Sequence, residues 1–227
     1  MYFCIFAIKI KTNIDQTDKE IDIMDLEKKN EVALDSIYDI EEMIEEALGE
    51  NDSEKAIVLW SKIIELDGSC LEAYSNRGYL YFTGGEDDEK AIEDFSMVIE
   101  LDPHNVSGFN VEAYFYRGCL YAMDEKTYKL AISDFNATIK IFPYKADVYF
   151  MRGGMYSQKF TTHKKALADF GKAIELDNSQ SKYYHARAII YKDNYLFDKA
   201  LADFRKALEL DNHNEDARFN IELIEKR

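Results

Sequence analysis

The sequence is dominated by a twelve-residue segment that the chain repeats at a nearly constant interval. Residues 166–177 read ALADFGKAIELD, and residues 200–211 repeat them as ALADFRKALELD. Looser copies begin at Ala56, Ala91 and Ala131, so that successive first alanines are 35, 40, 35 and 34 residues apart. This interval is typical of arrays of one supersecondary unit, in which each unit packs only against its neighbours. The chain is therefore expected to be such an array.

A second recurring segment precedes each of the last four copies. It places a tyrosine, an arginine, a small residue and another tyrosine at fixed spacing, beginning with Tyr74, Arg77, Gly78 and Tyr81. Both segments have the length and apolar spacing of amphipathic helices. The small residue lets a partner helix approach closely, and the two prolines, Pro103 and Pro143, each follow a second helix that they cannot continue.

The order of aromatic, small residue, aromatic, alanine, aromatic and proline resembles the tetratricopeptide repeat (TPR) family. The resemblance implies an all-α fold, a right-handed superhelical solenoid of helix–turn–helix units with terminal capping helices. A degenerate first unit carries Ile44 at the glycine position. The expected division is a leader at 1–24, an N-terminal helix plus the degenerate unit at 25–70, four TPR units within 71–214 (71–104, 111–144, 146–179 and 181–214), and a capping helix at 215–227.

The leader has two interpretations. It opens on MYFCIFAIKI, in which lysines follow the apolar residues instead of preceding them as in a signal peptide. The apolar run is also too short to span a membrane. It is either a disordered or strand-like segment, or a non-native extension with Met24 as the true initiator.

Helices that end the array are expected on both sides of it. Residues 25–48 carry apolar side chains at three- and four-residue steps as far as Leu48, and their glutamates are interpreted as a solvated face. In residues 215–227, Ala217, Ile221 and Ile224 form one apolar stripe, and we expect the remaining faces to be charged. A polar outer face is what a solenoid requires of its terminal element.

Charge and cysteine content limit the partners and the compartment. The chain holds 44 acidic and 28 basic residues, a net charge of −16. Nucleic acids and anionic lipids are themselves negative, so neither is expected as the main partner; the alternative is that the acidity serves only solubility. The three cysteines, Cys4, Cys70 and Cys119, are widely spaced and form no CxxC pair, which favours a reducing, cytoplasmic location without a disulfide framework.

No residues suggest catalysis, a cofactor or a metal. The four histidines are scattered, with no metal-ligand spacing and no adjacent nucleophile. Neither Gly-Gly pair has the spacing of a phosphate-binding loop. No apolar run approaches the ~18 residues of a membrane span. We therefore predict that the protein is not an enzyme.

Recurring charges have a structural interpretation and a functional one. Each unit with the recurring arginine also carries an aspartate before its aromatic residue in the second helix. We predict a ladder of Arg–Asp pairs in preference to an anion-binding site. The pairs would join Arg77, Arg117, Arg152 and Arg187 to Asp94, Asp134, Asp169 and Asp203. The surplus residues at 104–112 are either a partner-contacting loop or a longer solvated turn.

The resemblance implies that the first helices line a concave groove through six positions of each unit. Only Asn76 and Lys182 match the residues by which some TPR domains clamp a terminal carboxylate, so that clamp is not predicted. The predicted partner-binding residues are Asn76, Tyr79, Phe82, Glu112, Phe115, Tyr116, Cys119, Met123, Phe150, Met151 and Ile189. The alternative is that aromatic residues such as Phe150 simply pack between units.

Together these features predict a non-enzymatic protein–protein interaction module or scaffold. Its ligand would be a peptide or helix with apolar anchors and basic flanks, held by exposed apolar side chains and steered by acidic ones. The alternative is a chaperone or assembly factor that shields an apolar client segment. The oligomeric state is left open.

Overall fold

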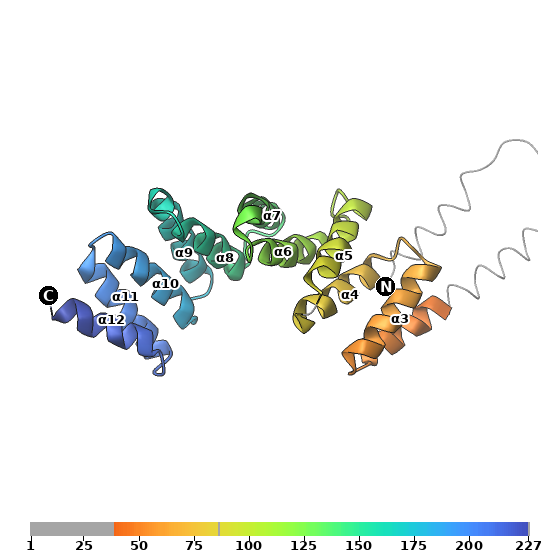
Figure 1. Ribbon diagram of the computed structural model, residues 1–227, viewed down its shortest axis with the longest axis horizontal. Coiled ribbons are helices and arrows are strands. Elements are labelled where there is room, and N and C mark those ends of the chain that lie inside the picture. Colours follow the sequence, from red (N-terminus) through yellow and green to blue (C-terminus); the bar gives the residue numbers. More distant parts are fainter. Residues whose placement is uncertain (1–38, 86, 227) are drawn as a thin grey trace, which may run out of the picture. The chain divides into compact units, whose positions relative to one another are not determined.

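A computed structural model describes residues 39–85 and 87–226, and these residues are helical throughout apart from short connections (Figure 1). Residues 39–49 are helical. They are followed by α3 (Ser53–Leu66), α4 (Leu71–Gly84), α5 (Asp88–Leu101), α6 (Asn110–Tyr121), η1 (Glu125–Thr127), α7 (Tyr128–Ile141), α8 (Ala146–Ser157), η2 (Phe160–Thr162), α9 (His163–Leu176), α10 (Ser181–Asp193), α11 (Phe197–Leu210) and α12 (Glu215–Glu225). The described residues contain no strand, and the predicted all-α fold of successive packed helices is confirmed.

The chain divides into two compact units, the first ending at Tyr116 and the second beginning at Arg117, within α6. In the first unit α3 packs on α4 and α4 on α5. In the second, each helix from α7 to α12 packs on the next. Expectations for residues 1–24 and for residues 25–38 of the N-terminal helix lie outside the described residues.

The core of the first unit forms around Trp60, which is 2% exposed. Ile40, Ile44 and Ala47 from the helix at 39–49 join it in one buried cluster. Leu48, expected on the same stripe, is 55% exposed and is not part of this cluster. The apolar stripe therefore ends one residue earlier than predicted.

A glycine in the first helix allows the two helices of each pair to approach closely. A Cβ atom added at Gly153 would lie 2.8 Å from Cε1 of Phe170, and one at Gly118 would lie 2.9 Å from the same atom of Phe135. Real Cβ contacts are essentially never this short. The glycine in α6 and α8 is thus required by the ring that packs on it. In the α10–α11 pair the same position is Ala188.

The Arg–Asp ladder is confirmed in all four repeat units. Each arginine donates through Nε and Nη2 to both carboxylate oxygens of the aspartate on the following helix, at 2.7–3.0 Å. The aspartate side chains are 5–10% exposed. The hydrogen bonds that these arginines donate to the aspartates raise the pKa of Arg77, Arg152 and Arg187. The recurring arginines therefore join the two helices of each repeat instead of forming an anion-binding site.

The connection between α5 and α6 is held by its own polar groups. The carboxylate of Asp102 accepts hydrogen bonds from the backbone N–H of Val106, at 2.9 Å, and of Ser107, at 2.7 Å. The amide of Asn110, which is 1% exposed, donates to the carbonyl of Asp102. The backbone adopts positive φ at Asn105 and Gly108. This segment is an ordered loop in which side chains accept hydrogen bonds from backbone N–H groups.

Candidate functional site

In the first unit, four ring side chains from α4 and α6 form an aromatic cluster: Tyr79, Phe82, Phe115 and Tyr116. The Tyr116 ring lies at its centre, with its centroid 5.2 Å from that of Tyr79, 5.0 Å from Phe82 and 5.3 Å from Phe115. It also stacks at 5.7 Å on the buried ring of Phe95. Tyr79 is 44% exposed, so the cluster joins the core to the surface.

The polar residues predicted beside this cluster lie on the same two helices. Asn76 donates its side-chain N–H to the carbonyl of Glu72, one turn earlier on α4, at 2.8 Å. Its amide is therefore oriented by its own helix. Glu112 is half-buried in the first turn of α6.

In the second unit, Phe150 of α8 packs between neighbouring helices. Its ring centroid lies 5.9 Å from that of Phe170 on α9 and 5.1 Å from that of Tyr183 on α10. The ammonium of Lys182 lies 5.3 Å from the centre of the same ring. Phe150 is half-buried and contributes to packing between repeats, as the alternative interpretation supposed.

The acidic residue next to Phe150 is neutralised within the fold. The carboxylate of Asp147 accepts hydrogen bonds from Lys182 Nζ and from the Tyr183 hydroxyl, both at 2.8 Å. Burial alone would raise the pKa of Asp147, but these hydrogen bonds lower it below its ordinary value. The ammonium of Lys182 offsets the charge of Asp147, which leaves this carboxylate little net charge with which to attract a partner.

The remaining predicted residues differ in exposure. Met123, just after α6, is 76% exposed. Cys119 is half-buried, and desolvation raises its pKa to about 12, so its thiol stays protonated. Met151 is also half-buried, and Ile189 packs against the buried cluster of Ala188 and Phe204.

Two exposed apolar residues of α12 were missed by the sequence reasoning. Ala217 and Ile224 are buried as expected and Ile221 packs against their cluster, but Phe219 is 65% and Leu223 is 42% exposed. The expectation of a charged outer face is therefore wrong. The two residues stand four apart on the helix and share a face. They occupy the fifth and ninth positions of what would be a further repeat, so continuing the register into residues 215–227 would have found them.

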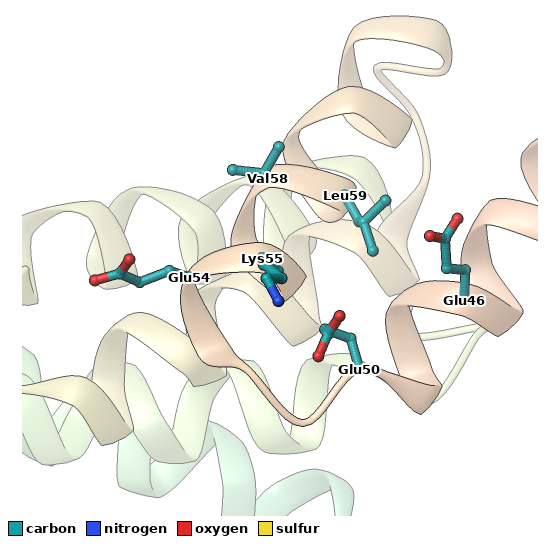
Figure 2. Close-up of a pocket in the computed structure, with 6 residues that line it drawn as sticks. All are labelled: Glu46, Glu50, Glu54, Lys55, Val58 and Leu59. Carbon is teal, nitrogen blue, oxygen red and sulfur yellow. The ribbon is translucent and has the colours of Figure 1, made fainter.

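An open depression of about 390 Å³ lies in the first unit between the helix at 39–49 and α3. Figure 2 shows Glu46 extending toward Leu59 across it, while Glu54 extends away. Glu50, Lys55 and Val58 complete the lining. The mixture of carboxylates with an apolar floor favours cationic groups with apolar stems.

His185 lies on α10, the first helix of its repeat, and makes the free energy of unfolding depend on pH. Its Nδ1 atom is buried without a hydrogen-bond partner among the described residues, and burial lowers its pKa below 6.5. As the pH falls through that value, the unfolded chain binds a proton before the folded chain does, so stability is lost toward acid.

The corresponding prediction compares two histidine variants. His185→Gln should lose less stability than the wild type between about pH 7 and pH 5, by at most about 1.4 kcal/mol per pH unit, the limit for one proton. His213→Gln, at an exposed position, should behave as the wild type does. Urea unfolding at both pH values measures the difference, and an acid sensitivity unchanged in His185→Gln would contradict it.

The part of the chain that the structure describes has neither a cluster of metal ligands nor a membrane-spanning helix. No three His, Cys, Asp or Glu side chains there lie together as metal ligands. No helix there combines the length and apolar character needed to cross a bilayer.

Comparison with known proteins identifies what the chain is similar to. The model of the tetratricopeptide repeat matches residues 181–214. Among curated proteins, none matches the chain. The structure is similar to the crystal structure of MamA, with 25% identity, a TM-score of 0.63, and 73% of this chain and 92% of that chain covered.

Two further solved structures share the fold. MamA from Desulfovibrio magneticus RS-1 is 21% identical, with a TM-score of 0.66 over 79% of this chain and 97% of that chain. YrrB, described as a TPR protein with an unusual peptide-binding site, is 20% identical, with a TM-score of 0.62 over 74% of this chain and 83% of that chain.

Proposed function

We propose that this chain, a tetratricopeptide-repeat protein, is a non-enzymatic interaction scaffold that binds a peptide or helix of a partner along the exposed faces of its first helices. The TPR fold and its solved relatives indicate a protein–protein interaction scaffold. One of those relatives, YrrB, is described as having a peptide-binding site. The site on this chain is argued below from its own residues.

The aromatic cluster is the observation that carries the proposal. Burying exposed apolar surface is the main driving force of association, and aromatic side chains dominate interface energetics. Tyr79 offers an exposed ring whose position is fixed by Tyr116 beneath it. A ring already ordered in the free protein loses little rotamer entropy on binding.

The second unit has its own exposed apolar surface, on α10, the first helix of its repeat, and on α12, which continues the same register. Phe219 and Leu223 are its most exposed apolar residues on α12, and Ile189 lies at the corresponding face of α10. Phe150 and Met151 lie deeper and support this surface. The proposed contact residues of the second unit are therefore those of α10 and α12.

The partner is expected to carry apolar anchors and basic flanks. Residues 1–116 contain 28 acidic and 9 basic residues, so the aromatic cluster lies in a strongly negative half of the chain. Such a field accelerates encounter with a positive partner and disfavours a negative one. The widely spaced cysteines support a reducing, cytoplasmic setting.

The test uses two exposed rings of the proposed surface, Tyr79 and Phe219. Phe150 is avoided because alanine there would also disturb packing against Phe170 and Tyr183. The double variant Tyr79→Ala plus Phe219→Ala should retain the wild-type helicity and capture partners from native lysate at least about tenfold less well, as expected for two interface anchors. Quantitative mass spectrometry of the captured proteins measures the loss.

The matched control removes two exposed rings outside the proposed surface. Phe142 and Tyr144, 46% and 72% exposed, lie in the connection between α7 and α8. Alanine at both should leave capture unchanged. A partner held equally by the wild type and by both variants would contradict the placement of the site on the first helices.

A further inference from the structure

The net negative charge of this chain is confined to residues 1–116. Residues 117–227 contain 19 Lys and Arg residues against 16 Asp and Glu, a net charge of +3, whereas residues 1–116 carry −19. Salt screens charges beyond about 8 Å at physiological ionic strength, so local charge matters more than the total. The second unit can therefore meet an anionic partner that the whole-chain charge argued against.

Four of its lysines lie close to where α9 and α11 begin, together with exposed apolar side chains. We call this the basic turn edge, and it consists of Lys159, Phe160, Lys164, Lys165, Tyr195, Leu196 and Lys199. Phe160 is 68% exposed, Tyr195 is 76% exposed and Leu196 is 42% exposed, and all four lysines are exposed. Phe160 and Tyr195 stand at equivalent positions of successive repeats, seven residues after Gly153 and Ala188.

Contacts between successive turns hold this edge together. His163 at the start of α9 lies between Ser157, whose carbonyl is 3.2 Å from Nε2, and Asn194 of the next turn, whose Nδ2 is 3.1 Å from Nδ1. The ring of Phe160 packs on the His163 ring at 5.0 Å. The ammonium of Lys159 lies 5.2 Å from the centre of the Tyr128 ring on α7. These contacts hold in place the turns that carry the exposed apolar side chains of the edge.

The lysines of the edge have no carboxylate partner in the described part of the chain. Three of them instead hold their ammonium groups 5.2–5.6 Å from tyrosine ring centres. The arginines that the structure describes in the second unit are, by contrast, paired with aspartate or glutamate. The edge therefore presents four lysines without ion pairs, against the two exposed carboxylates of Asp193 and Asp198 in the same turns, and keeps a net positive charge.

We propose that the basic turn edge docks the protein on an anionic lipid surface. Its anchors project from turns instead of lining a closed pocket, so the partner must supply the apolar medium, as the boundary between headgroups and acyl chains does. Lysines reach headgroup phosphates while their methylene stems stay in the apolar boundary. Nucleic-acid recognition favours bidentate arginines, and those that the structure describes in this unit are already paired with carboxylates and are not part of the edge. This surface is independent of the proposed groove.

Vesicle sedimentation of the full chain tests the proposal. The protein should bind vesicles of phosphatidylcholine containing about one third phosphatidylserine, and not pure phosphatidylcholine, with binding that weakens as salt rises. Lys164→Glu plus Lys165→Glu should reduce the partition coefficient at least about tenfold. Phe160→Ser plus Tyr195→Ser should also reduce it about tenfold through lost apolar burial.

Matched controls separate the edge from general charge and hydrophobicity. Lys62→Glu plus Lys140→Glu makes the same charge change at exposed positions elsewhere, and Phe142→Ser plus Tyr144→Ser removes two other exposed rings. Both should bind vesicles as the wild type does. Absence of wild-type binding, or equal loss in the controls, overturns the proposal. So does an edge-dependent complex with labelled polyglutamate or oligouridylate in the absence of vesicle binding, which would assign the edge to an acidic protein or to nucleic acid.

Discussion

Replacing Asp169 with alanine should lower the free energy of unfolding by about 3 kcal/mol, the cost of breaking a buried ion pair by removing one partner. The change leaves the Nε and Nη2 groups of Arg152 without the carboxylate that now accepts both hydrogen bonds, at 2.8 and 2.7 Å. The Arg152 side chain is only 18% exposed, so water cannot fully replace the lost acceptor. Urea unfolding followed by circular dichroism measures the loss.

Two controls identify burial as the cause. Glu225→Ala breaks the Arg205–Glu225 pair, which has the same 2.7 Å separation but side chains 61% and 49% exposed, and should cost less than about 0.5 kcal/mol. Arg152→Met combined with Asp169→Leu should recover most of the stability, because an apolar pair removes both buried charges together. Equal losses in Asp169→Ala and Glu225→Ala would show that the ladder contributes no more than a surface pair.

The adjacent glycines of α8 should respond to alanine with opposite signs. At Gly153 the new Cβ would lie 2.8 and 2.9 Å from ring atoms of Phe170, and 3.2 Å from Cβ of Asp169. Phe170 is 2% exposed and cannot move aside, so overpacking of about 2 kcal/mol or more outweighs the helix-propensity gain of about 1 kcal/mol. Gly153→Ala is expected to destabilise the protein.

At Gly154 an added Cβ meets nothing within 4 Å. Gly154→Ala should therefore stabilise the protein by about 0.5–1 kcal/mol through helix propensity alone. Since both changes lie on one helix and add one methyl group, the difference between them isolates the close approach of α8 and α9. Thermal unfolding of the two variants measures it, and stabilisation by both would mean that the helices are less closely packed than described.

The repeat pattern determined the architecture because each unit is specified by contacts that recur at constant spacing. In three of the four repeat units a glycine faces a phenylalanine, in the fourth Ala188 takes its place, and in all four an arginine lies one turn from its tyrosines, so the same two helices pack against each other. The Arg–Asp pairs could be predicted for the same reason: residues 16 or 17 positions apart meet whenever an antiparallel helix pair closes. Ile44 in the degenerate unit could be assigned to the core, where it lies beside Trp60.

Side-chain exposure was less predictable, because it depends on neighbours that the pattern does not specify. Phe150 and Tyr79 both occupy positions expected to line a groove, yet Phe150 packs on Phe170 and Tyr183 while Tyr79 stays 44% exposed. Asp147 lies one turn before Phe150 on α8, and Lys182 and Tyr183 of the next repeat donate hydrogen bonds to its carboxylate. Contacts between successive repeats therefore determine how exposed these side chains are.

The sequence by itself therefore determined the helix–turn–helix repeat, its ion-pair ladder and the uneven division of charge along the chain, since all three follow from residue identity at regular spacing. Only the tertiary structure decided which apolar residues stay at the surface and which lysines gather on one edge. Phe160 and Tyr195 lie 35 residues apart in the sequence, on two turns that the His163–Asn194 contact joins, and both side chains are exposed, as is Phe219 of α12. Exposure is a property of the neighbours that a residue acquires when the chain folds.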